Sequence, residues 1–227
     1  PALMKRIVSL GFSPFMILAT DSVITIILNA SLQHYGGPEQ GDLLIAASTI
    51  IQSWLLMITS TMLGISSGTQ AILSYNYGAA NSLRIKKAER TILSLCLIFT
   101  SIMFVLSRIF PAPFAGIFTR EPDTVSMAVR GIHTVTLAII PLSLQYCFVD
   151  GFTAIGRTKT ALALSMLRKG TYVLSVLFLP LFFGAANAFY AEPICDGLGA
   201  AVSTITFLLV FQKHLDRRTA PTDIMVS

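Results

Sequence analysis

Five ionisable residues lie at four places inside long apolar segments, where an ionised side chain costs about 2.5 to 3.5 kcal/mol on membrane-insertion scales. They are Asp21, Asp150, the neighbours Arg168 and Lys169, and Asp196. Because such a charge is costly in hydrocarbon, each position is a candidate for ion binding, proton binding or an internal ion pair. The pattern favours a membrane protein that binds ions or protons, or forms internal ion pairs, within the bilayer.

Arg168 and Asp196 are predicted to reach similar depths. Arg168 lies about ten residues into its apolar segment and Asp196 about seven or eight residues into the next. At about 1.5 Å rise per residue both reach roughly 10 to 15 Å, close to the bilayer midplane. The two side chains could therefore pair, either as a structural salt bridge or as part of a proton or cation relay.

Two aspartates differ in their surroundings. Asp21 also falls near mid-depth, and the sequence offers it no obvious cationic partner. An unpaired carboxylate there could bind and release a proton, as a proton-coupled antiporter needs. Alternatively, Asp21 is a hydrogen-bonded structural residue, or it contacts a further half of the protein that this sequence does not include. Asp150 lies only about 9 Å from the end of its segment at Gly156, which favours a structural or vestibule role.

Polar and aromatic residues are scattered through the same segments. Candidates for the lining of a cavity that accepts flat organic cations are Gln52, Gln70, Gln145, Tyr75, Tyr77 and Tyr146. Hydrogen bonds between helices and anchoring at the membrane interface explain them nearly as well.

Signatures of enzymes and metal sites are absent from the sequence. No G-x-x-x-x-G-K-[ST] phosphate loop occurs, so ATP hydrolysis is not expected. The three histidines, His34, His133 and His214, are scattered. The three cysteines, Cys96, Cys147 and Cys195, lie in separate apolar segments, which favours buried thiols over metal ligands or disulfides.

Composition indicates an all-α integral membrane protein. Of 227 residues 54% are hydrophobic and 12% charged, whereas a soluble domain has roughly 45 to 50% apolar and about 25% charged residues. In lipid a helix satisfies all its backbone hydrogen bonds within one segment. Runs long enough to span a bilayer predict six transmembrane helices at 12–35, 43–66, 90–110, 126–154, 158–184 and 189–212. The proline-rich segment 111–123 is predicted to be interfacial.

Positive charge falls in alternate connectors. One side carries 11 of the 16 Lys and Arg residues: Lys5, Arg6, Arg84, Lys86, Lys87, Arg90, Arg157, Lys159, Lys213, Arg217 and Arg218. The opposite connectors, at 34–42, 118–123 and 183–188, carry Arg120 among several acids. The positive-inside rule therefore predicts a multi-pass protein of the cell membrane with both termini, including the tail 213–227, in the cytoplasm. Basic residues confined to connectors do not indicate a nucleic-acid partner.

Several short stretches resemble the multidrug and toxic compound extrusion (MATE) transporter family. Residues 68–70 (GTQ) and 74–81 (SYNYGAAN) are similar to its GxQP and YNYGA stretch, with Ala71 in place of the usual proline. Further similarities follow in family order at 27–29 (ILN), 35–37 (YGG), 154–157 (AIGR), 167–169 (LRK) and 193–196 (PICD).

The resemblance implies the carboxy-terminal lobe, spans seven to twelve, of a twelve-span transporter. Its expected partners are the lipid bilayer, an amino-terminal six-helix lobe and small cationic, amphipathic compounds exported in exchange for Na⁺ or H⁺, with no other cofactor. Asp21 resembles a position that is acidic in some members. A flippase for lipid-linked oligosaccharides and a non-transporting truncated module are the alternatives. The first residue is Pro1 rather than methionine, which suggests a piece of a longer protein.

Overall fold

The computed structural model describes residues 2–211, and their side chains from residue 19 onward with the exception of residue 39. Within that range every regular element is helical and no strand occurs, which confirms the all-α class. The elements are α1 (Ala2–Gly68), α2 (Gln70–Gly78), α3 (Ser82–Ile109), α4 (Pro111–Phe118), α5 (Pro122–Val135), α6 (Ile139–Ala154), α7 (Thr158–Phe183) and α8 (Ala191–Thr206), with short 3₁₀ or π turns at Thr136–Ala138, Ala185–Tyr190 and Phe207–Phe211.

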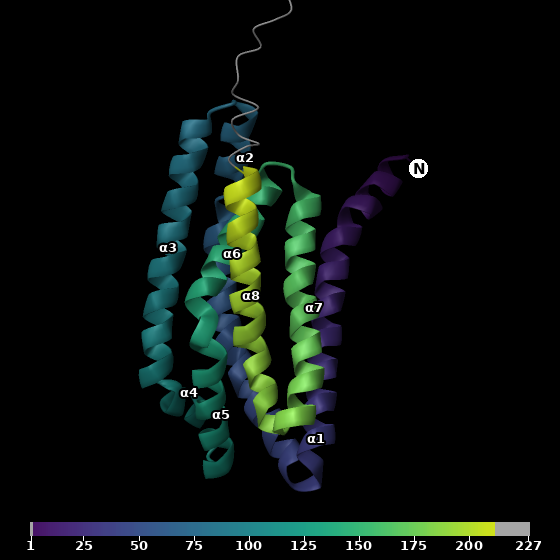
Figure 1. The fold of residues 1–227 in the computed structure, drawn as a ribbon, viewed down its shortest axis with the longest axis vertical. Helices are drawn as coiled ribbons and strands as arrows, with labels where there is room; N and C mark the ends of the chain where they lie inside the picture. Colours follow the sequence, from purple (N-terminus) through teal and green to yellow (C-terminus); the bar gives the residue numbers. More distant parts are fainter. Residues whose placement is uncertain (1, 212–227) are drawn as a thin grey trace, which may run out of the picture.

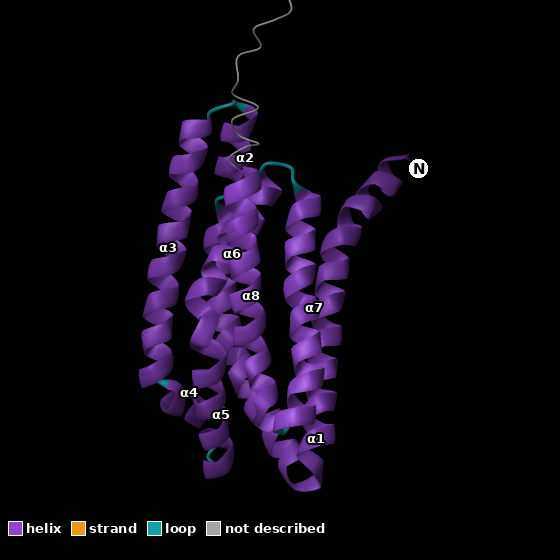
Figure 2. Ribbon diagram, in the orientation of Figure 1, coloured by secondary structure: helices purple, strands orange, loops and turns teal. Residues whose placement is uncertain are grey.

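The long helices stand side by side as a bundle of antiparallel rods (Figures 1 and 2). Helix α1 folds back on itself at Gly37 and supplies two rods. The α2–α3 and α6–α7 connections lie at the same end of the bundle as the start of α1, and the α3–α4 and α7–α8 connections lie at the other (Figure 1). The chain therefore crosses the bundle in alternating directions, as the charge pattern predicts.

Five described segments are long and apolar enough to cross a membrane. They are Gln40–Gly78, Ser82–Ile109, Pro122–Ala154, Thr158–Phe183 and Ala185–Phe211. The remaining predicted span, 12–35, lies in the first limb of α1, where the side chains before residue 19 are outside the described ones. Residue 212 and the predicted tail 213–227 also lie outside the described residues.

Two predicted connectors are largely helical. Segment 34–42 joins the two limbs of α1, and the helix is interrupted within it only at Gly37. Basic residues 84–90 form the first turns of α3, where the side chain of Asn81 accepts a hydrogen bond from the backbone N–H of Arg84. Straight-chain Lys and Arg favour helix, and their long stems let the charged ends reach water beyond the apolar part of the rod. Segment 111–123 contains the short helix α4.

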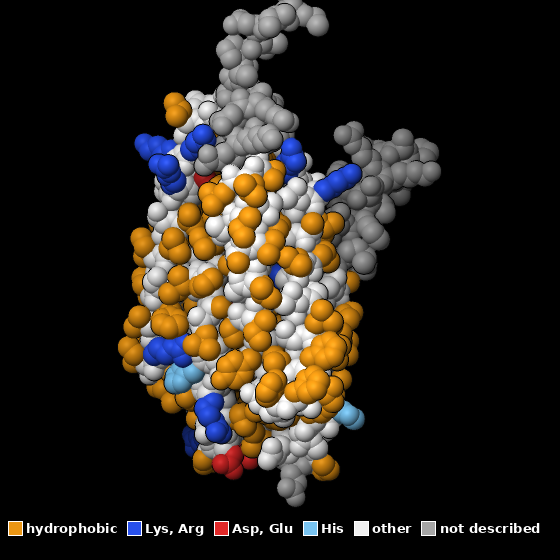
Figure 3. All heavy atoms as spheres, in the orientation of Figure 1, with side chains coloured by type: hydrophobic (Ala, Val, Ile, Leu, Met, Phe, Trp, Pro, Cys, Tyr) orange, Lys and Arg blue, Asp and Glu red, His pale blue; other side chains and the backbone are white. Residues whose placement is uncertain are grey.

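Apolar side chains fill the contacts between rods and also cover their outer faces. One buried cluster includes Ile51, Trp54 and Ile139, and a second includes Met62 and Phe152. Outside these clusters many large apolar side chains remain exposed, and they cover the flank of the molecule in Figure 3 while charged side chains gather toward its two ends. A surface of this kind matches a hydrocarbon solvent.

The fold-back of α1 depends on two glycines. Gly37 has φ 68° and ψ −170°, a conformation that is essentially restricted to glycine. A Cβ added to Gly36 would lie 2.9 Å from backbone atoms of Gly41, closer than unbonded atoms approach. The two limbs can therefore meet at this turn only without a side chain at position 36.

We expect Gly36→Ala to lower the free energy of unfolding by about 1 to 3 kcal/mol, because the backbone has to move apart. The matched control is Gly170→Ala in α7, where an added Cβ meets open space; it should be neutral or stabilising by up to about 1 kcal/mol. Unfolding of both variants by denaturing detergent, followed by circular dichroism, measures the difference. Equal stability of the two variants would contradict the close approach.

Candidate functional site

Arg168 holds two acids of the neighbouring helix. Its Nε donates a hydrogen bond to Oδ1 of Asp196 at 2.8 Å, and Nη2 lies 3.4 Å from Oε1 of Glu192. The side chain of Asp196 is 1% exposed and that of Arg168 20%. The predicted pairing of Arg168 with Asp196 is confirmed, and Glu192 is a member of the cluster that the sequence reasoning missed.

The helical repeat explains why Glu192 joins the cluster. Glu192 and Asp196 are four residues apart in α8, so both side chains lie on the same face, which packs against α7. This i, i+4 spacing was the available signal. Their oxygens and Sγ of Cys195 lie within 4.8 Å of one another, close enough to hold a metal ion. Arg168 already supplies a cation there, so we interpret the group as an ion-pair cluster.

Asp21 has a cationic partner, contrary to the sequence-based expectation. Nζ of Lys169 lies 2.7 Å from Oδ1 of Asp21. The two residues are 148 positions apart in the sequence and lie on helices α1 and α7, so only the packing of these helices brings the charges together. The side chain of Asp21 is 57% exposed, so the pair sits at the surface of this bundle.

A second polar group joins α2, α3 and α6. Nε2 of Gln70 donates a hydrogen bond to Oδ1 of Asp150 at 2.9 Å, while the buried Oδ2 of Asp150 has no hydrogen-bond partner. Beside it lies Glu89 of α3, 5% exposed, whose two carboxylate oxygens also have no partner. None of the described cations pairs with Glu89 or Asp150. The group therefore holds two acids and one neutral amide.

The sequence reasoning did not consider Glu89, which lies among the basic residues just before the predicted span at residue 90. It faces inward because α3 already begins at Ser82, so that Glu89 lies on the buried stripe of the helix together with Ile85, Ile92 and Cys96. A Cβ added to Gly151 would lie 2.8 Å from Oε1 of Glu89, so the carboxylate occupies the space that this glycine leaves next to Asp150. A single acid inside a basic run, one turn from the apolar segment, was the available signal.

The other predicted site residues are placed differently. Tyr146 is half-buried on α6, one turn before Asp150, and lies within electrostatic range of Arg168 and Asp196. Gln145 is buried, and its Nε2 donates a weak hydrogen bond of 3.5 Å to the carbonyl of Leu164. Gln52 is exposed on the second limb of α1 and belongs to neither group.

Cys96, Cys147 and Cys195 are all free and buried, in agreement with the prediction of buried thiols. The interior of the bundle therefore carries the two polar groups described above, and the described residues include no nucleophile paired with a base. Charged clusters at membrane depth are typical of ion and substrate pathways.

Comparison with known proteins identifies the family. The MatE family model matches residues 14–188. This chain belongs to the MatE family. The FAD transporter of Shewanella oneidensis is 25% identical over 174 residues, which are 69% of this chain and 38% of that protein. Multidrug export protein MepA of Staphylococcus haemolyticus is 22% identical over 200 residues, which are 86% of this chain and 42% of that protein.

Solved structures share the fold. An inward-facing multidrug resistance MATE family transporter of the MOP superfamily has a TM-score of 0.83 at 16% identity, covering 97% of this chain and 50% of the other. A MOP superfamily transporter from Pyrococcus furiosus has a TM-score of 0.79 at 15% identity, covering 97% and 48%. The chain thus spans about half of the solved chains and about two fifths of the curated relatives. It has the fold of one lobe of a MATE-type membrane transporter.

Proposed function

We propose that this MatE lobe is the carboxy-terminal half of a secondary active exporter that exchanges Na⁺ or H⁺ for cationic, amphipathic compounds. The amino-terminal six-helix lobe would complete the transporter. In this proposal Glu89 of α3 and Asp150 of α6 bind the coupling ion, and the Arg168 cluster holds α7 against α8.

The observation that carries the proposal is the pair of unneutralised acids, Glu89 and Asp150. Three of their four carboxylate oxygens lack a hydrogen-bond partner. Burying an ionised carboxylate without a counter-charge is costly, so such a group gains free energy by binding a proton or a small cation. By contrast, Asp196 and Asp21 already have cationic partners.

Two classes of substrate compete. The exposed acid Asp21 and the half-buried Tyr146 of α6 favour cationic, flat compounds, and one relative is named a multidrug export protein. The other relative is named an FAD transporter, which makes an anionic aromatic compound the second candidate. Efflux of ethidium and of FAD from cells that co-express this lobe with a matching amino-terminal lobe distinguishes them.

Ethidium efflux that collapses when the proton or sodium gradient is removed would support the proposal. Efflux of FAD alone would redirect it to the second candidate. Transport of neither compound, in cells where both lobes reach the membrane, would contradict it in favour of a flippase or a non-transporting module.

Asp21→Asn should weaken ethidium efflux about tenfold if Asp21 attracts the cationic substrate, while FAD efflux should not fall. The substitution also releases Lys169 from its ion pair, so Lys169→Gln is the matched control: it breaks the same pair but leaves the acid. Efflux assays on both variants separate the loss of the carboxylate from the loss of the pair. Unchanged efflux in Asp21→Asn would remove this residue from substrate binding.

Orientation in the cell membrane follows from charge. We propose that the end with the α2–α3 and α6–α7 connections faces the cytoplasm, because it holds most of the connector Lys and Arg residues. The exposed residue Leu83 stands at this end. A cysteine substituted for Leu83 should react with a membrane-impermeant thiol reagent only when the cytoplasmic face is accessible; reaction in intact cells would reverse the assignment.

A further inference from the structure

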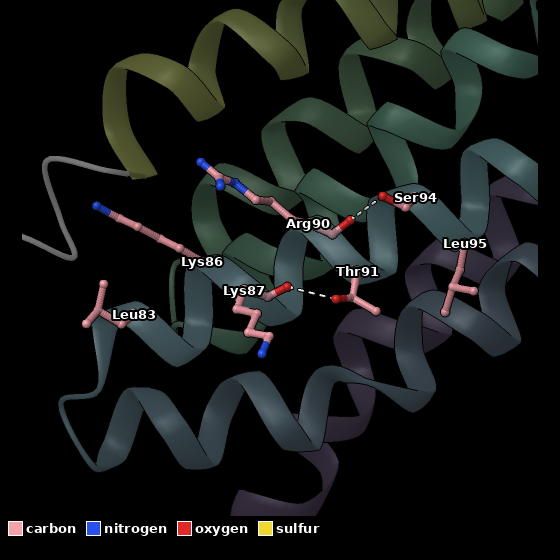
Figure 4. A pocket seen from close by; sticks show the side chains of 7 residues that line it. All are labelled: Leu83, Lys86, Lys87, Arg90, Thr91, Ser94 and Leu95. Atoms are coloured by element: carbon pink, nitrogen blue, oxygen red, sulfur yellow. Dashed lines mark hydrogen bonds between the residues drawn. The ribbon is translucent and has the colours of Figure 1, made fainter.

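An exposed side of α3 carries a shallow groove at the end that is proposed to be cytoplasmic. It encloses about 600 Å³ and is lined along two neighbouring stripes of the helix, Lys86, Arg90 and Ser94 on one and Lys87, Thr91 and Leu95 on the other. Figure 4 shows Lys86 and Arg90 extending to one side of α3 and Lys87 extending toward α2. A second groove of about 300 Å³ between α2 and α3 shares Lys87, Thr91 and Leu95.

Among the described residues that line the groove, the charged ones are all cations. Three of its lining residues are cations, Arg84 adds a fourth in the adjoining groove, and neither groove is lined by an acid. The hydroxyls of Thr91 and Ser94 already donate to the backbone carbonyls of Lys87 and Arg90 (Figure 4). An occupant would therefore be held by ammonium and guanidinium groups, which favour an anion such as a phosphate.

An apolar stripe continues from the groove along the same face of the helix. Leu95, Ile98, Ile102, Val105 and Ile109 follow at intervals of three or four residues, and each is at least half exposed. Lys87 and Leu95 are eight residues apart, or about 12 Å along the helix axis. A ligand that fits this face carries an anionic head at one end and a long hydrocarbon chain at the other.

We propose that this groove, formed by Lys86, Lys87, Arg90, Thr91, Ser94 and Leu95, is a binding site for an anionic phospholipid of the cytoplasmic leaflet. Lys87 and Arg90 contact the phosphate, and one acyl chain lies along the Leu95 stripe. The cytoplasmic leaflet supplies anionic lipids, and basic pockets of membrane helices on that side bind their head groups. The proposal rests on the orientation of the lobe and not on its transport activity.

The test titrates the purified full chain in neutral detergent with phosphatidylglycerol or phosphatidylcholine and counts bound lipid by native mass spectrometry. We expect a clear preference for phosphatidylglycerol. The double variant Lys87→Gln/Arg90→Gln should raise the Kd for phosphatidylglycerol about 30-fold, because each cation near an anionic lipid contributes roughly fivefold. The conservative variant Lys87→Arg/Arg90→Lys should restore binding.

Arg120→Gln/Arg130→Gln is the matched control, since it removes two exposed cations, one in the α4–α5 connection and one in α5, at the other end of the bundle. An equal loss of binding in this control, or equal affinity of the natural chain for both lipids, would overturn the proposal. If millimolar inorganic phosphate displaces bound phosphatidylglycerol at a constant lipid concentration, the groove is a site for free anions and the lipid assignment is overturned. Circular dichroism of each variant shows that its helices are intact.

A second measurement places the occupant in the native membrane. A photoreactive benzophenone residue introduced at Leu95 should form cross-links to phospholipid that mass spectrometry identifies. Cross-links to a peptide, whether from the second lobe or from another protein, would overturn the proposal even if the purified chain binds lipid.

Discussion

Arg168→Leu should lower the free energy of unfolding by about 3 to 5 kcal/mol, because it leaves Asp196 buried without a counter-charge. Asp196 is 1% exposed, and Glu192, also part of the cluster, is 15% exposed. Removal of one partner of a buried pair is costly since the other charge cannot return to water. Unfolding in denaturing detergent, followed by circular dichroism, measures this change.

The adjacent cation provides a control within the same helix. Lys169, itself 12% exposed, pairs with Asp21, whose side chain is 57% exposed. Because the acid that Lys169→Leu leaves behind is not buried, this substitution should cost no more than about 1 kcal/mol. Adding Asp196→Asn to Arg168→Leu should restore part of the stability, because the buried negative charge is removed with its partner. If Arg168→Leu and Lys169→Leu have the same effect, the Arg168 cluster does not stabilise the fold.

Glu89→Gln and Asp150→Asn should each reduce ion-coupled efflux at least tenfold while leaving the lobe folded. An amide of the same shape cannot exchange a proton or neutralise a cation. Since these acids lack counter-charges in the folded protein, their neutralisation should leave stability unchanged or raise it by about 1 to 3 kcal/mol. Lost transport together with retained or increased stability is the signature of a group that is kept for function.

The measurement pairs ethidium efflux in cells that contain both lobes with detergent unfolding of the isolated lobe. Asp123→Asn, an exposed acid in the first turn of α5, is the control, and it should alter neither quantity. Wild-type efflux in the Glu89→Gln/Asp150→Asn double variant would exclude this group from coupling and leave Asp21 as the remaining acidic candidate.

The contact between Glu89 of α3 and Gly151 of α6 shows that the position of a site residue can depend on a neighbouring helix. Nothing in the spacing of Glu89 within α3 reveals that Gly151 of α6 leaves room for its carboxylate. The sequence places Glu89 in a basic run, where a solvent-exposed ion pair is the ordinary expectation. Gln70 was predicted as a cavity residue, but its hydrogen bond to Asp150 depends on how α2 packs against α6.

The sequence alone determined the solvent and the class of this protein. Apolar runs of spanning length, separated by connectors of alternating charge, are consequences of local composition, because lipid requires each segment to satisfy its own backbone. The depth of Arg168 and Asp196 could likewise be counted along each helix, so their pairing was predictable. Short stretches such as 74–81 indicated the family for the same reason, since they are contiguous in the chain.

Tertiary structure alone decided which charges are neutralised. Asp21 was expected to be unpaired and is held by Lys169, whereas Glu89 drew no attention and is a buried acid whose two oxygens have no hydrogen-bond partner among the described residues. A helix defines the angle between its own side chains, but the rotation of one helix against another is set by packing of apolar surfaces across the whole bundle. Partners from different helices are therefore fixed only when the bundle assembles.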